Sequence, residues 1–226
     1  MPSSTVFNLL EACREPGCPL CRLEVRSVER YLDNQFYENV NSPKWRDGLR
    51  ASLGFCHEHA WLGVNKRLGD ALGYSIIYRD ILNALLKQLN DDASRRRVSL
   101  RERIDKMLDI FMPRKRCPVC EKRDEARHIL IDVLVEEIKT PEMIEALRAS
   151  DGLCLPHLRV TLEHIRDVPD CEKIVNIQRE KLESLSAELS EFIRKNDYQS
   201  AHEGFGKEGD AWLRAIQMVV GRRKEG

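Results

Sequence analysis

A repeated cysteine motif constrains this chain more than any other feature of its sequence. Residues 47–59 read DGLRASLGFCHEH, and residues 145–157 read EALRASDGLCLPH. Both contain LRAS, a glycine, and a histidine three places after a cysteine. A Cys-Pro-x-Cys stands upstream of each copy, and its second cysteine precedes the Cys-x-x-His by 35 residues in one case and 34 in the other. Matched anchors at matched spacing indicate two homologous halves, at roughly 14–91 and 113–196.

The segments between these anchors predict helices. Apolar residues recur there with the 3.6-residue period of an amphipathic helix. Each segment is followed by a turn that contains proline, by a short helix that ends at the LRAS, and by a bend that Gly54 or Gly152 permits. No stretch shows the alternation of a strand. The periodic positions are Val28, Tyr31, Leu32, Phe36 and Val40 in the first half and Ala126, Ile129, Leu130, Val133, Leu134 and Ile138 in the second.

Longer helical patterns complete each half. They cover about 73–90 and 171–195, and a helix with a capping box at Ser99 and Glu102 ends before Pro113. We therefore expect an all-α fold: residues 1–91 as a first metal-binding repeat, 92–112 as a connecting helix, 113–196 as a second repeat and 197–226 as a helical extension. The last helix, about 207–220, should place its apolar residues in the core. These residues are Trp212, Ile216, Val219 and Val220. We also expect Trp61 of the first half to lie in the core.

The repeated cysteines and histidines carry the chemistry. Two ligands three residues apart at the start of a helix point the same way, so two such pairs can converge on one ion. Zn²⁺ is the usual occupant of a closed Cys₃His site. Pro19 and Pro118 suit the first helical position, which brings the preceding thiolate near the positive helix end. We predict two structural zinc ions per chain, held by Cys18, Cys21, Cys56, His59, Cys117, Cys120, Cys154 and His157.

The repeat also decides between neighbouring candidates. CHEH offers His57 and His59, and alignment with CLPH places His57 on Leu155 and His59 on His157, so we choose His59. Because repeats usually close locally, we expect each metal to take its four ligands from one half. In the crossed alternative, the first Cys-Pro-x-Cys joins the second Cys-x-x-His. The remaining cysteines and histidines have no counterpart and are assigned structural or surface roles: Cys13, Cys171, His128, His164 and His202.

Two other uses of the same cysteines stay open. An iron–sulfur cluster suits a sulfur-rich ligand set. A Cys-Pro-x-Cys at a helix start also resembles a redox dithiol, although the βαβ context of that motif is missing and the Cys-x-x-His pairs stay unexplained. A covalent c-type haem is disfavoured because Arg22 and Glu121, not histidines, follow the Cys-x-x-Cys.

Composition narrows the function further. Lys plus Arg and Asp plus Glu number 37 each, so the chain lacks the basic excess of a dedicated nucleic-acid binder. The short runs RRR at 95–97 and RKR at 114–116 are interpreted as solvated surface. No apolar run is long enough to span a membrane and no signal peptide is apparent, so we expect a cytoplasmic protein. With no recognisable catalytic motif, we assign no catalytic residue and expect a binding or regulatory protein with protein partners.

The motifs as a set resemble a known family. GCPLC, GFCHEH and CPVC…GLCLPH, followed by a tail with DYQ and with DAW before VVG, are similar to a bacterial and archaeal domain family of unknown function. The resemblance covers nearly the whole chain. It supports the eight candidate ligands and implies no activity.

Overall fold

The protein is helical throughout the part that the structure describes. The computed structural model describes residues 4–93, 99–198, 200 and 202–221, and it contains no strand there. The all-α prediction is confirmed. The helices in chain order are α1 (Ser4–Cys13), α2 (Pro19–Glu38), α3 (Pro43–Ala51), α4 (His57–Asn65), α5 (Ala71–Ala93), α6 (Leu100–Phe111), α7 (Pro118–Glu137), α8 (Pro141–Ala149), α9 (Leu155–His164), α10 (Val168–Lys195), the 3₁₀-helix η1 (Lys207–Asp210) and α11 (Ala211–Val220).

The two halves contain the same succession of helices. Helices α2 and α7 each have 20 residues, and α3 and α8 each have nine. Helices α4 and α9 follow, with nine and ten residues, and then the long helices α5 and α10. This is the order that the repeat predicts. The periodicity located these helices, whereas α1 was missed, although Val6, Leu9, Leu10 and Cys13 have helical spacing.

Local signals explain where several helices begin and bend. Pro19 and Pro118 are the first residues of α2 and α7, where a missing N–H costs nothing. Ser99 and Glu102 form the predicted capping box of α6. Gly54 and Gly152 have φ angles of 90° and 82°, which a residue with a side chain adopts only with strain. These glycines turn the chain from α3 into α4 and from α8 into α9.

The described chain divides into two compact units that differ from the sequence halves. Unit 1 contains residues 4–25 and 126–221, and unit 2 contains residues 26–93 and 99–125. Helices α2 and α7 contribute residues to both units. The four segment boundaries predicted from the repeat are not tested by this division and stay a prediction.

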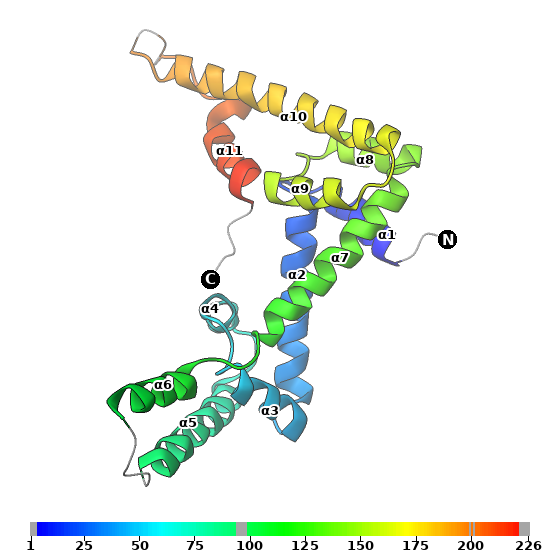
Figure 1. The fold of residues 1–226 in the computed structure, drawn as a ribbon. Helices are drawn as coiled ribbons and strands as arrows, with labels where there is room; N and C mark the ends of the chain where they lie inside the picture. The colour runs from blue at the N-terminus through cyan, green and yellow to red at the C-terminus, as the bar shows by residue number, and fades with distance from the viewer. Residues whose placement is uncertain (1–3, 94–98, 199, 201, 222–226) are drawn as a thin grey trace. The chain divides into compact units, whose positions relative to one another are not determined.

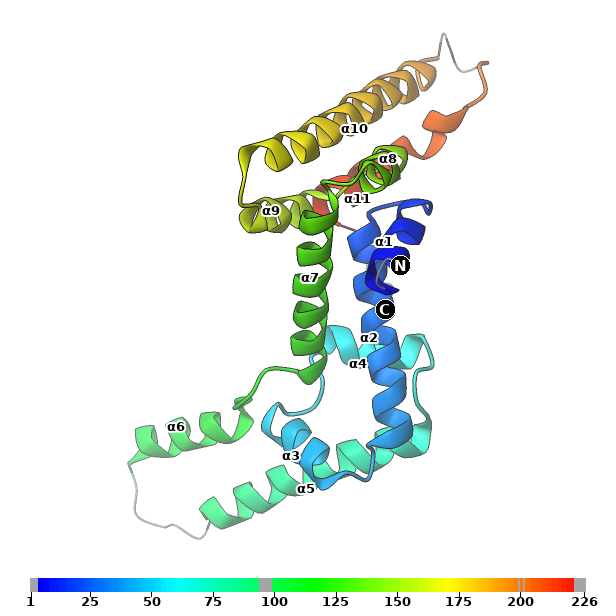
Figure 2. The same ribbon diagram turned by 90° about the vertical axis from the view of Figure 1, so that its right-hand side faces the viewer.

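Unit 1 is built around the first turns of α2, the second half of α7 and helices α1, α8, α9, α10 and α11. Figure 2 shows α8 and α11 beneath the long α10. Its core consists of aliphatic side chains, and full burial of each such side chain stabilises the fold by roughly 1.5–3 kcal/mol. Fully buried examples are Leu9, Ile131, Leu134, Ile138, Met143, Leu147, Ile174 and Ile177.

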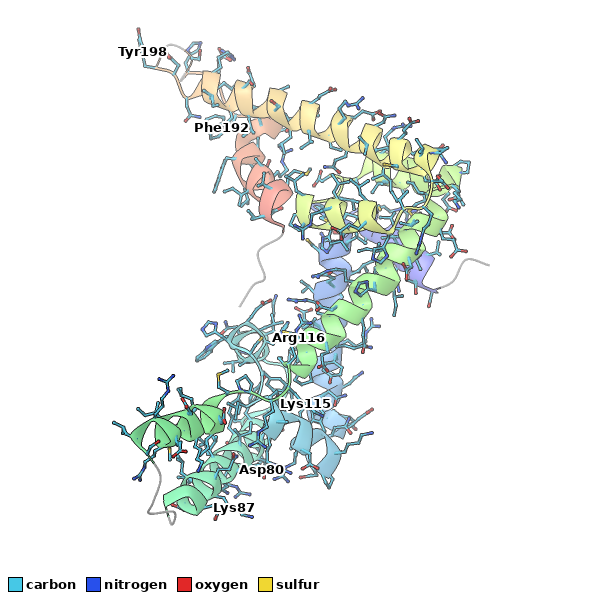
Figure 3. All side chains as sticks on the ribbon, viewed as in Figure 1. Asp80, Lys87, Lys115, Arg116, Phe192 and Tyr198 are labelled. Atoms are coloured by element: carbon cyan, nitrogen blue, oxygen red, sulfur yellow. The ribbon has the colours of Figure 1, made fainter. Side chains whose placement is uncertain are left out.

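Unit 2 has a more aromatic core. Phe36 of α2 packs against Trp45 and Tyr74, with ring centroids 6.3 and 4.3 Å away. Asp80 of α5, labelled in Figure 3, accepts hydrogen bonds from Arg46 and Arg50 of α3 and so joins these two helices. Helix α6 lies beside the C-terminal part of α5 (Figure 1).

One expectation about the core is wrong. Trp61, Trp212, Ile216, Val219 and Val220 are each more than half exposed. Helix α11 instead packs through Ala211 and Met218, which lie on its opposite side. The periodicity correctly showed an amphipathic helix but did not show which neighbours would cover its apolar face. The RRR run at 95–97, which we interpreted as solvated surface, lies outside the described residues.

Candidate metal centres

The eight candidate ligands form two clusters, and each cluster combines the two halves of the sequence. Site 1 consists of Cys18, Cys21, Cys154 and His157, and site 2 consists of Cys56, His59, Cys117 and Cys120. Within each site the four donor atoms lie within 4.8 Å of one another. The expectation that each metal takes its ligands from one half is therefore wrong. The Cys-Pro-x-Cys of one half meets the Cys-x-x-His of the other.

Both sites are built from helix N-termini. Cys18 precedes α2 and Cys21 lies in its first turn, while Cys154 is the N-cap of α9 and His157 lies in the first turn of that helix. Site 2 uses the N-termini of α7 and α4 in the same way, with Cys56 as the N-cap of α4. The positive ends of four helices thus face the sulfur atoms in pairs, which favours thiolates.

The donor distances in site 1 fit one small cation. Nδ1 of His157 lies 3.1 Å from Sγ of Cys154 and 3.3 Å from Sγ of Cys21. The Sγ atom of Cys18 is 3.5 Å from the same nitrogen, and the Sγ atoms of Cys21 and Cys154 are 3.6 Å apart. A disulfide needs about 2.05 Å, whereas tetrahedral zinc, with Zn–S about 2.3 Å and Zn–N about 2.0–2.1 Å, places its donors about 3.6–3.8 Å apart.

A carboxylate orients the histidine of site 1. The Nε2–H of His157 donates to Oε1 of Glu24 at 2.9 Å, so Nδ1 is directed at the cysteines. Arg127 of α7 in turn donates to both oxygens of Glu24, at 2.5 and 3.2 Å. Only 6% of Glu24 is exposed. A carboxylate behind a ligating histidine fixes the ring and raises its basicity, as in many zinc sites.

The electrostatics of site 1 reflect this network. Burial lowers the pKa of His157, but hydrogen bonds with Cys154, Cys21 and Glu24 more than offset it and raise that pKa to about 11. Burial raises the pKa of Glu24, yet hydrogen bonds from His157 and Arg127 lower it overall. Hydrogen bonds from Cys154 and Cys18 lower the pKa of Cys21. The site is therefore able to stabilise a thiolate beside a positively charged partner.

The end of α11 shields the sulfur atoms of site 1. Gly221 ends this helix with φ of 88°, and a Cβ added to it would lie 3.7 Å from Sγ of Cys21 and of Cys154. On another side, Asp151 accepts a hydrogen bond of 2.6 Å from the N–H of Gly17, next to the first ligand. All four residues of site 1 are buried, and Cys154 is only 1% exposed.

Site 2 has the same donors and a more open environment. Nδ1 of His59 lies 3.2 Å from Sγ of Cys56 and 3.4 Å from Sγ of Cys120. The Sγ atom of Cys117 is 3.8 Å from that nitrogen. His59 and Cys117 are buried, whereas Cys56 and Cys120 are partly exposed. Two of the three cysteines of site 2 are therefore less enclosed than any residue of site 1.

Site 2 also has a carboxylate near its histidine. Nε2 of His59 lies 4.0 Å from Oε1 of Glu58, and the Oε2 atom of the same carboxylate lies 3.9 Å from Nη1 of Arg123. Burial raises the pKa of Cys117, and it raises that of Cys120 to about 12, with Cys117 and Cys56 adding to the second shift. Thiols of raised pKa hold their protons until a cation replaces them.

The residues that the repeat left unmatched lie outside both clusters. His57 is exposed, which agrees with the choice of His59. Cys13 is buried in the core of unit 1, and burial raises its pKa to about 11. His128 stacks on His164, which also contacts Asp132 at 3.0 Å.

Sequence reasoning missed the residues behind the ligands. Glu24 stands three places after Cys21, so helical spacing alone puts it on the same face of α2. The second half has Arg123 at that position, and Glu58 then takes the place beside the histidine. Arg127 and Gly221 had no sequence signal, because each reaches site 1 only through tertiary packing.

Comparison with known proteins agrees with the motifs. A model described as a family of unknown function (DUF6062) matches residues 6–226. The chain belongs to this family. The resemblance seen in the cysteine motifs is thereby confirmed.

A relative of this chain is found among curated proteins. An "Uncharacterized 23.9 kDa protein in xynA 3'region" from Caldicellulosiruptor sp. (strain Rt8B.4) is 26% identical over 222 residues, covering 94% of this chain and 99% of the relative. No solved structure matches. Within the described residues, no helix combines the length and apolarity that crossing a membrane requires.

Proposed function

We propose that this DUF6062 protein binds two zinc ions, one in each site, and that both ions are structural. The observation that carries the proposal is the repeated donor set, in which three sulfur atoms and one Nδ1 lie within 4.8 Å of one another in each site. Glu24 behind His157 adds the outer carboxylate that zinc-ligating histidines usually have.

Four protein ligands favour a structural role over a catalytic one. A catalytic zinc keeps one position open for water or substrate, and a Cys₃His set fills all four positions of a tetrahedron. Glu58, which stands between two ligands of site 2, therefore has no metal-bound water to activate. Its carboxylate lies 4.0 Å from Nε2 of His59 and 3.9 Å from the guanidinium of Arg123.

With the crossed pairing, each zinc links two helices that lie far apart in the sequence. In site 1 the ion joins the start of α2 to the start of α9, with Cys21 and Cys154 separated by 133 positions. In site 2 it joins the starts of α4 and α7, with Cys56 and Cys120 separated by 64 positions. Such links remove conformational freedom from the unfolded chain, so metal binding contributes directly to folding.

We infer that the folded protein acts through its helical surface, as a binding or regulatory protein. Helices α4, α6 and α11 each expose large apolar side chains, including Trp61, Leu108 and Trp212. Exposed apolar side chains gathered on a helix face are typical of protein-binding surfaces.

An iron–sulfur cluster is the alternative for the same cysteines. A cluster places several irons and sulfides between its ligands, and this spreads the donors more than one ion does. The short donor distances favour a single ion. A dithiol enzyme needs accessible thiols, whereas Cys18 and Cys21 are both buried and the second Cys-Pro-x-Cys pairs a buried Cys117 with a partly exposed Cys120.

Elemental analysis tests the proposal directly. Protein purified without oxygen and without a histidine tag is expected to contain two zinc ions per chain and to be colourless. Iron with matching sulfide would replace the zinc assignment by a redox one. Protein without metal whose thiols react rapidly would contradict both.

A further inference from the structure

One face of helix α6 is both apolar and exposed. Leu100, Ile104, Leu108 and Phe111 are each at least half exposed, and their spacing of four, four and three places them on one face of the helix. We call these four residues the α6 stripe. No residue of α6 is buried.

The helix that pairs with α6 is equally open in this region. Among residues 71–91 of α5, whose burial is described, Ile81 is the last buried one. Leu82 and Leu86, which follow it, are more than half exposed. Together the two helices form a hairpin with a capping box that stabilises its second helix by about 1 kcal/mol. Helices of this length gain most of their stability from packing, so an unpacked apolar face predicts a partner.

The charges that border the α6 stripe indicate which partner. At about 100° per residue, Arg101 and Asp105 lie along the same border of the stripe, one turn apart, and both are exposed. An antiparallel second copy, related by a two-fold axis, presents this border in reverse order. Arg101 of each copy then approaches Asp105 of the other.

We propose that the α6 stripe is a homodimer interface, in which the α5–α6 hairpins of two chains pack antiparallel. Stable interfaces bury about 800 Å² per partner. The stripe offers four apolar side chains that are at least half exposed, which amounts to surface on the order of a few hundred Å² per copy. Their burial forms the core of the interface, and the charged borders set its antiparallel orientation.

The apolar face of α11 does not indicate its own partner. Arg214 is the one charged residue of that helix, and it already pairs with Glu188 and Asp210. The border of the face therefore lacks the two opposite charges that point to a second copy at α6.

The decisive measurement is the dimer dissociation constant by analytical ultracentrifugation of the full chain. Leu108→Glu places a charge in the interface twice, once per copy, and should weaken the dimer by roughly thirtyfold or more. Leu72→Glu is the matched control, because this leucine is 68% exposed at the other end of α5. Circular dichroism and zinc content should stay unchanged in both variants, since neither side chain is buried.

A charge reversal tests the antiparallel orientation. Arg101→Glu alone should weaken the dimer a few-fold, in line with the small energies of exposed ion pairs. The combined variant Arg101→Glu, Asp105→Arg should restore it, because the reversed border is again self-complementary. A monomeric native protein would overturn the proposal. So would a dimer that tolerates Leu108→Glu, a dimer that Leu72→Glu disrupts equally, or a double variant no tighter than the single one.

Discussion

The two units use the same four donors and surround them differently. In unit 1 all four ligand residues are buried, His157 contacts Glu24 at 2.9 Å, and Gly221 of α11 lies against two sulfur atoms. In unit 2, Cys56 and Cys120 are partly exposed and His59 lies 4.0 Å from Glu58. Site 1 is thus an enclosed cluster, whereas two of the four residues of site 2 are partly open to the surface.

The helices that follow the long helices α10 and α5 differ in the same way. Helix α11 packs on α10 through Ala211 and Met218, and ion pairs such as Lys195 with Glu208 hold the connecting segment. Phe192 near the end of α10 (Figure 3) also stacks on Phe205 at 5.1 Å. Helix α6 has no buried residue. The helix that follows the long helix of each unit is therefore packed in unit 1 and largely uncovered in unit 2.

Burial, more than loop length, should set the relative strength of the sites. The ligand pairs of site 1 are separated by 133 positions and those of site 2 by 64, close to one doubling. Doubling a loop changes its closure cost by only about 0.6 kcal/mol. Outer carboxylates change zinc affinity by about 10–100-fold. The following experiments test this ranking.

Removing one ligand from each site should give the largest effects. Cys154→Ser and Cys56→Ser should each lose one zinc per chain. Structural zinc contributes about 10–16 kcal/mol in small peptides at pH 7, comparable to the about 5–15 kcal/mol stability of a typical domain. We expect Cys154→Ser to unfold unit 1, and Cys56→Ser to lower the melting temperature less. Circular dichroism and elemental analysis measure both.

Cys171→Ser is the control for these two variants, since this partly buried cysteine belongs to neither cluster. It should keep two zinc ions and nearly native stability. Equal losses of helicity in the two ligand variants would remove the proposed difference between the sites.

Metal release should proceed in two phases. Because Cys56 and Cys120 are partly exposed, a chelator or peroxide should remove the zinc of site 2 well before that of site 1. A colorimetric zinc indicator follows the release over time. In Cys56→Ser the fast phase should be missing and the slow phase kept; a single phase in the native protein would contradict the ranking.

The outer carboxylates should contribute unequally. Glu24→Gln weakens the acceptor for Nε2 of His157 and reduces the pairing with Arg127, so we expect a loss of zinc affinity of about 10–100-fold at site 1. Glu58→Gln, with its 4.0 Å separation from His59, should change affinity at site 2 by less than about tenfold. Competition titrations with a chelator of known affinity measure both. A larger effect of Glu58→Gln would reverse the comparison.

The smallest expected effect is the loss of the ion pair of Glu208, which holds η1 and α11 against α10. Hydrogen bonds from Lys195 and from backbone N–H groups lower the pKa of Glu208 from 4.5 to about 2. The folded state therefore binds fewer protons than the unfolded state between these values. The contribution of Glu208 to the free energy of unfolding is complete above pH 4.5 and is lost as the pH falls toward about 2.

Hydrogen exchange in α11 measures this loss, with Glu208→Gln as the reference over the same pH range. Both proteins lose zinc in acid, so only their difference reports on Glu208. The native protein should protect α11 better above pH 4.5, and the two should converge below it. Parallel curves at all pH values would show that the ion pair with Lys195 does not hold this helix.

Local sequence determined much of this protein. The 3.6-residue period, the prolines at the starts of α2 and α7, and the capping box at Ser99 located the helices. The spacing of three placed each pair of candidate ligands on one helical turn, and the repeat selected His59 over His57. These features depend on neighbours within a few residues, which is why the sequence alone reveals them.

Tertiary structure alone decided which pairs meet. Either Cys-x-x-His could in principle approach either Cys-Pro-x-Cys, because both motifs are nearly identical in the two halves. The docking of α9 beside the start of α2, and of α4 beside the start of α7, selected the crossed arrangement. The same packing brought Arg127 to Glu24 and Gly221 to the sulfur atoms, and it left the apolar faces of α6 and α11 exposed. Contacts between distant segments depend on how whole helix surfaces fit together, and a short repeated motif carries no information about that packing.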